Sequence, residues 1–184
     1  MKRLTSEEMS HEVVEIISIA TNKIHKCIID NLTVDEKNCE NYNQLKSKLL
    51  CAVFLDIASI ANYIYLSNCL DKKNFDEIKN LYYIVLFKSL DAIYDEENKA
   101  LAINFIAELT EQYSSYFTDN DYLDKVTKHF TKTITKTRMD IPYDIDIPDG
   151  LSISYAPHLY MIIYHGLSSF LLSLQHVMNE FEIT

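Results

Sequence analysis

Glycine and proline are almost absent from this chain of 184 residues, which contains two glycines and three prolines. Glycine-rich phosphate loops need backbone that adopts unusual torsion angles and approaches the ligand closely. β-Sandwiches need turn residues about every 8–12 positions. The scarcity therefore excludes Rossmann, P-loop, nucleophile-elbow and hairpin-rich folds, and it predicts an all-α protein.

All five of these residues lie in one short stretch near the C-terminus. They are Pro142, Pro148, Gly150, Pro157 and Gly166, whereas the first 141 residues contain neither type. We therefore expect the first 141 residues to be nearly continuous helix and 140–166 to hold the irregular backbone. Because loops on a rigid scaffold often carry function, we expect the functional site in that stretch.

Composition and charge are those of a soluble protein with one core. The chain is 48 % hydrophobic and 24 % charged, and its length is sufficient for a single helical domain over 1–184. A net charge of −10 disfavours nucleic acid and anionic membranes as partners and favours a basic protein. Residues 139–184 contain six acids and no lysine or arginine.

The cysteines and the N-terminus predict a cytoplasmic location. The four cysteines form no C-x-x-C pair, and Cys27 and Cys51 lie among apolar neighbours, where we expect them to be buried. Acidic Glu7 and Glu8 stand where a signal peptide would be apolar. A reducing compartment fits these features.

A long uncharged stretch near the C-terminus raises the question of a membrane anchor. Residues 151–179 contain no Asp, Glu, Lys or Arg. They do contain three histidines and five serines, whose insertion into a bilayer is costly. We expect a buried core helix instead, and no membrane association.

Apolar residues spaced three or four apart predict about six helices. Their expected ranges are 5–31, 41–66, 75–94, 96–117, 121–138 and 158–181. We expect the last to be the central or most buried helix. The fifth is ambiguous because its threonines alternate as in a strand, but four lysines that share one helical face favour a helix; these are Lys125, Lys128, Lys132 and Lys136.

Between the fifth and last helices the apolar period changes to two. Ile141, Tyr143, Ile145 and Ile147 alternate with polar residues and prolines, and Asp149-Gly150 can form a turn. The pattern predicts a short β-hairpin or an extended segment near 141–155.

The acids of this segment are the first candidate site. They resemble the start of a calcium loop, but Pro148 occupies the third ligand position and Tyr155 stands in place of the bidentate glutamate. The acids can deter aggregation of an edge strand, or they can form an acidic docking element with nearby aromatic anchors. The candidate docking residues are Asp140, Tyr143, Asp144, Asp146, Asp149 and Tyr155.

Histidines form the second candidate. His158, His165 and His176 share one face of the last predicted helix, but they are roughly 10 and 16 Å apart along its axis. That spacing is too wide for one metal ion, so no metal site and no cofactor is predicted. His158 and His165 could instead border a ligand pocket together with His11 or His129.

No catalytic motif appears in the sequence, and the prediction is therefore weighted toward binding. We expect an acidic protein-binding module, of the inhibitor, immunity or antitoxin kind, whose target is a basic protein. The alternative is a helical enzyme or a ligand or metal sensor with a histidine-lined pocket. A structural homo-oligomer is a third possibility.

Overall fold

The computed structural model describes residues 2–150 and 156–183, and the protein is all-α as predicted. Its long helices share one hydrophobic core. They are α1 (Ser6–Asp30), α3 (Tyr42–Cys69), α4 (Phe75–Ser89), α5 (Glu96–Tyr116), α6 (Tyr122–Met139) and α8 (Pro157–Glu180). The short elements are α2 (Val34–Lys37), a 3-10 turn at Leu90–Ala92, and strands β1 (Lys2–Leu4) and β2 (Phe181–Ile183).

Two helices begin at a threonine that forms a capping box. Thr5 caps α1 by exchanging hydrogen bonds with Glu8, and Thr33 caps α2 in the same way with Glu36. Helix α2 lies in a polar stretch where the sequence predicted only a connection. Helix α5 is capped by Asp95, whose carboxylate accepts the backbone N–H of Asn98.

The ambiguous fifth segment is a helix, α6. Four of its five threonine hydroxyls donate to the carbonyl one turn back, as Thr131 does to Thr127 at 2.7 Å and Thr137 does to Thr133 at 2.9 Å; the exception is Thr135. These hydrogen bonds give the hydroxyls partners within the helix, so a buried threonine there leaves no hydroxyl unpaired at these positions. The alternation of β-branched residues therefore does not reflect a strand.

Helix α3, rather than the C-terminal helix, is central. It packs against α1, α5 and α6 and also touches α4 and α8. Helix α8 buries one face, from Leu159 to Val177, against α1 and α6, but Met161 and Leu172 on its other face are exposed. The expectation of a central C-terminal helix is wrong. A central helix is covered by neighbours on most sides, whereas α8 has one apolar face and is covered on that side only.

Only α3, among the described residues, is long and apolar enough to cross a membrane. A core helix of a soluble bundle has the same composition, and 67 % of the most apolar stretch of α3 is buried against other helices.

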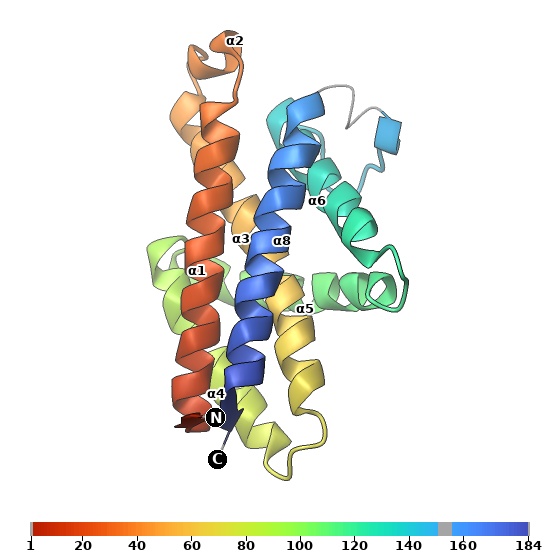
Figure 1. The fold of residues 1–184 in the computed structure, drawn as a ribbon. Helices are drawn as coiled ribbons and strands as arrows, with labels where there is room; N and C mark the ends of the chain where they lie inside the picture. The colour runs from red at the N-terminus through yellow and green to blue at the C-terminus, as the bar shows by residue number, and fades with distance from the viewer. Residues whose placement is uncertain (1, 151–155, 184) are drawn as a thin grey trace.

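Figure 1 shows how the helices are arranged. Helices α1 and α8 run side by side, α5 crosses behind them, and α2 lies at the opposite end from the two termini. At the end that holds the two termini, β1 and β2 form a parallel pair, with Arg3 opposite Glu182. The sequence did not predict this pair, whose strands are only three residues long.

The segment between α6 and α8 contains no strand over 141–150, so the hairpin alternative is wrong for these residues. Residues 141–148 are irregular chain with a turn at 143–145, and 149–150 are helical. Of the alternating apolar side chains, Ile147 is buried but Ile145 is exposed, so they do not share a buried face. The second half of the expected hairpin, 151–155, lies outside the described residues. Here the name strap is used for residues 140–150.

The close approach of α1 and α8 depends on Gly166. A β-carbon at this position would lie 2.5 Å from Cγ1 of Ile24. Gly166→Ala should therefore lower the free energy of unfolding by about 1–3 kcal/mol, measured by urea denaturation. Gly150→Ala is the control, because nothing lies within 4 Å of its added carbon. Equal stability of the two variants would contradict this account of the helix contact.

A buried ion pair fixes α2 to the end of α6. Arg138 donates from Nε and Nη2 to both carboxylate oxygens of Glu36, at 2.8 and 2.6 Å. Burial raises the pKa of Glu36, but hydrogen bonds from Arg138 and Thr33 outweigh it and lower the pKa to about 2.

Glu36→Gln should consequently destabilise the protein by roughly 2 kcal/mol at pH 7. Since the folded pKa is lowered, the contribution of this carboxylate is present above about pH 4.5 and is lost as the pH falls toward 2. The difference in the free energy of unfolding between variant and wild type, measured by urea denaturation, should therefore shrink as the pH falls through this range. Glu40→Gln, an exposed substitution in the same connection, should leave stability unchanged.

Candidate functional site

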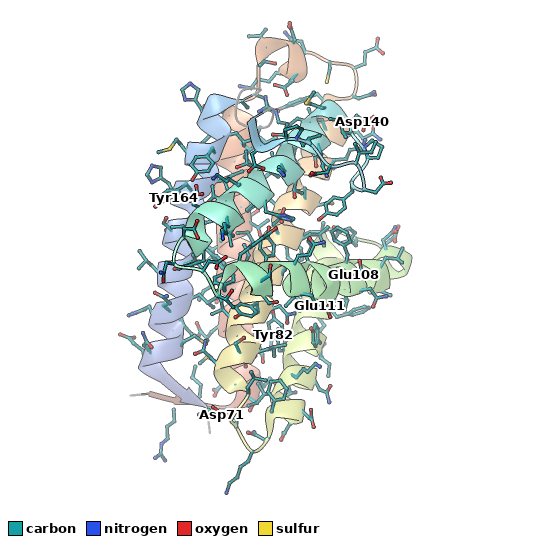
Figure 2. All side chains as sticks on the ribbon, turned by 90° about the vertical axis from the view of Figure 1, so that its right-hand side faces the viewer. Asp71, Tyr82, Glu108, Glu111, Asp140 and Tyr164 are labelled. Atoms are coloured by element: carbon teal, nitrogen blue, oxygen red, sulfur yellow. The ribbon has the colours of Figure 1, made fainter. Side chains whose placement is uncertain are left out.

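A cavity of about 500 Å³ opens between α3, α5, α6 and the strap. Figure 2 looks onto this side of the bundle, with Asp140 labelled at the end of α6 and Glu108 and Glu111 on α5. The wall from α3 is one continuous helical face, because its residues recur three or four positions apart. The lining residues are Gln44, Ser47, Lys48, Cys51, Ala52, Leu55 and Asp56 of α3, Phe105 and Leu109 of α5, Thr133, Lys136 and Thr137 of α6, and Asp140, Ile141 and Tyr143 of the strap.

Asp56 belongs to the α3 wall of the cavity and has no solvent exposure. One carboxylate oxygen, Oδ1, accepts a short hydrogen bond from the Tyr113 hydroxyl. The other oxygen, Oδ2, has no hydrogen-bond partner among the described residues. An unpaired buried carboxyl oxygen is costly, and proteins normally satisfy such atoms with a side chain, a water molecule or a ligand.

The surroundings of Asp56 favour its neutral form. Burial raises the pKa of Asp56 to about 8, and the hydroxyls of Tyr113 and Thr133 offset this only in part. The hydrogen bond of the Thr133 hydroxyl goes to the backbone carbonyl of His129. At pH 7 the carboxyl is therefore mostly protonated, but little free energy is needed to ionise it.

Aromatic rings connect this carboxyl to a second, smaller cavity. Tyr113 packs edge-on against His129, with ring centroids 5.1 Å apart. Burial and the nearby charges of Lys132 and Lys136 lower the pKa of His129 to about 4, so the ring is neutral at pH 7. His129 faces the cavity of about 350 Å³ on the other side of Tyr143.

The strap forms the outer wall of both cavities. Asp140 ends α6 in the left-handed conformation, with a φ of 54°, and the chain then folds back along α6. The ammonium of Lys136 donates to the Tyr143 carbonyl at 2.9 Å, and Lys132 pairs with Asp149 at 2.8 Å and Asp146 at 3.4 Å. The lysine face of α6 therefore holds the strap in place.

Tyr143 of the strap lines the same cavity as the buried carboxyl. Its ring packs edge-to-face on Phe105, with centroids 4.9 Å apart, and Lys136 Nζ lies 5.4 Å from the centroid of the Tyr143 ring. Burial raises the pKa of Tyr143, and Asp56 adds to this effect. Tyr143 and Phe105 thus form an aromatic wall close to Asp56.

The residues expected to form one acidic docking surface are divided by the structure. Asp140 and Tyr143 line the larger cavity, where Asp140 pairs with Lys48 at 2.8 Å. Asp144 and Asp146 line the smaller one. Asp149 pairs with Lys132, as described above, and Tyr155 lies outside the described residues.

The histidine face expected on the last helix does not form a pocket. His158 and His165 are exposed, as are His176 and His11, and none of them borders a described cavity. Only His129, of the histidines considered for a pocket, borders one. Among the described side chains, no group of three or more His, Cys, Asp or Glu residues could hold a metal ion.

The two cysteines that the sequence predicted to be buried differ in their exposure. Cys51 lines the large cavity and is half-buried, and burial raises the pKa of its thiol. Cys27 is exposed, contrary to expectation, because it lies on the solvent side of α1.

Sequence reasoning missed the most informative residue, Asp56. The signal that could have found it is its isolation, since it is the single charged residue between Lys48 and Asp71. A lone carboxylate in a long apolar helix is either paired or functional.

The contacts of the strap generate a prediction about its mobility. Lys132→Gln removes both ion pairs to the strap, so hydrogen exchange of the backbone amides in 141–150 should become faster. Global stability should change by less than about 1 kcal/mol, because these pairs are partly exposed. Lys128→Gln is the control, since Lys128 pairs with Asp124 inside α6. If exchange in the strap is the same in both variants, the lysines do not hold it.

The site therefore consists of a buried carboxyl with one free oxygen, an aromatic wall and a mouth that contains an ion pair. Chemically, this arrangement can receive a molecule that is apolar along its length and polar at its inner end. The chain matches no protein-family model, no curated protein sequence and no solved structure.

Proposed function

We propose that this protein binds a small organic molecule in the cavity between α3, α5, α6 and the strap. One observation carries the proposal: Asp56 lines the cavity, is fully buried, and its Oδ2 atom has no hydrogen-bond partner among the described residues. Ligand sites typically combine an apolar lining with a few directed polar groups, and this cavity has that character.

The size and lining of the cavity support the proposal. Its volume of about 500 Å³ lies within the usual range for small-molecule sites. Leu55, Phe105 and Leu109 supply apolar surface, while Lys48 and Asp140 form an ion pair at the mouth. A ligand would bury apolar area against the helices and give Asp56 the partner that it lacks.

The free-energy cost of an unpaired buried carboxyl oxygen favours a ligand over an empty site. A buried polar group without a partner destabilises a fold by about 1–3 kcal/mol, and a hydrogen bond to a charged group returns a similar amount. Binding proteins keep such groups because they give orientation and specificity when the ligand arrives. No part of the proposal requires a reaction, so it concerns a carrier or a sensor.

The predicted acidic docking surface receives less support. The strap acids Asp146 and Asp149 pair with Lys132, and Asp140 pairs with Lys48, so these charges are partly neutralised within the chain. Binding of a basic protein, and assembly into a homo-oligomer, stay predictions. A cytoplasmic location is also part of the proposal, supported by the free thiols of the four cysteines.

The proposal can be tested by filling the cavity. Nile red, a neutral dye that fluoresces in apolar surroundings, should bind wild type at a single site. Ala52→Phe places a ring in the cavity and should weaken binding by at least about tenfold, with Ala52→Leu giving a smaller loss. Ala107→Phe, on the exposed side of α5, should leave binding unchanged.

Circular dichroism and urea denaturation would verify that each variant is folded. Dye binding that is equally strong in Ala52→Phe and wild type would place the dye elsewhere and contradict the proposal. Absence of any saturable binding by wild type would contradict it as well.

A further inference from the structure

We infer that the ligand of this cavity is an amphipathic amine, whose ammonium group donates a hydrogen bond to Oδ2 of Asp56 and whose apolar body lies against Phe105 and Tyr143. The inference rests on the proposed function, since it names the chemical class that the same cavity would accept. It adds the identity of the group at the inner end.

The distribution of charge around the cavity is the first argument. Each lysine at the mouth already has a partner within the chain, because Lys48 pairs with Asp140 and Lys136 donates to the carbonyl of Tyr143. Asp56 has only neutral hydroxyls as partners: Tyr113 donates to Oδ1, and the Thr133 hydroxyl also lowers the pKa of the carboxyl. Lys136 also bonds to a neutral group, but its side chain is only half-buried and can be hydrated, whereas Asp56 is fully buried with one oxygen unpaired among the described residues. A cation is what would complete this buried carboxyl.

The aromatic wall is the second argument. Tyr143 and Phe105 meet edge-to-face, and the ammonium of Lys136 already lies over the Tyr143 ring. Electron-rich ring faces attract cations. A carboxylate combined with aromatic walls favours an organic ammonium over a neutral or an anionic head group.

The proton balance of binding follows from the state of Asp56. The free site holds a mostly neutral carboxyl, and the amine arrives with its proton. When the ammonium donates to Oδ2, the carboxyl ionises and its proton leaves to solvent, so the complex contains a carboxylate and an ammonium. Besides Tyr113 on α5, which bonds Asp56, the titratable groups that line the cavity are Lys48 and Cys51 on α3, Lys136 on α6, and Asp140 and Tyr143 of the strap.

The competing possibility is a neutral hydrogen-bond acceptor. A protonated Asp56 could donate from Oδ2 to an alcohol or carbonyl oxygen, without any ionisation. Affinity for such a ligand would not increase with pH. The two possibilities therefore differ both in the preferred head group and in the pH dependence.

Three indole compounds of nearly the same shape separate these possibilities: tryptamine, the alcohol tryptophol, and indolepropionate. The protein has no tryptophan, so fluorescence excited where only indole absorbs reports the ligand alone. Tryptamine should bind at least about tenfold more tightly than tryptophol, a difference of about 1.4 kcal/mol, and indolepropionate should bind most weakly.

The pH dependence of wild type provides a readout that needs no variant. Tryptamine stays protonated between pH 6 and 8, whereas Asp56 ionises more readily as the pH rises. Its affinity should therefore increase by about tenfold or more over this range, and calorimetry in buffers of different ionisation enthalpy should show proton release. The affinity of tryptophol should stay flat or fall.

Asp56→Asn tests the residue itself. Asparagine keeps the shape of the side chain and can still accept from Tyr113, but it carries no charge. The variant should lose at least about tenfold in affinity for tryptamine and lose the pH dependence, while tryptophol binding changes by less than about threefold. Glu111→Gln, which removes an exposed acid of α5 (Figure 2), should have no effect on either ligand.

The outcomes distinguish this inference from the proposed function. If tryptophol binds as well as tryptamine, or if tryptamine binds Asp56→Asn as well as wild type, the amine is not the preferred class. If tryptamine does not bind although Nile red occupies the cavity, the inference of an amine ligand fails, but the proposed small-molecule site is still supported. If neither binds, the proposed function fails as well.

Discussion

The burial of α3 on nearly all sides is the constraint on which the rest of the structure depends. Helices α1, α5 and α6 all pack against it, and each contributes apolar residues to the shared core. Because α3 is enclosed, any polar side chain on it must find its partners inside the bundle. Asp56 finds one in Tyr113, its other carboxylate oxygen has no partner among the described residues, and the residue lines a cavity of the bundle. The candidate site thus follows directly from the packing of the central helix.

The lysines of α6 have a structural use that their pattern alone did not reveal. A row of lysines on a helix usually faces solvent, but Lys132 and Lys136 hold the strap against the bundle. The acids of the strap therefore have internal partners. Charges that the sequence suggested for a partner protein are used to form the wall of a cavity, and the region predicted to carry function does border the site.

The helices could be predicted because their signals are local. Apolar spacing and the caps at Thr5 and Asp95 gave helix ends within a few residues of those observed. The strap was harder, since a period of two is shared by strands and by extended chain held by side chains. Asp56 could not be placed, because its environment depends on which helices surround α3. The exposure of His158 and His165 likewise depended on packing that a helical projection does not contain.

Tyr143 stands between two cavities, and this position has a consequence for what the protein can hold. The same side chain, with Thr133 and Lys136, borders the space of about 500 Å³ and the space of about 350 Å³ beyond it. Because these side chains belong to both walls, a molecule that displaced Tyr143 in one space would also change the outline of the other, with no movement of the helices required.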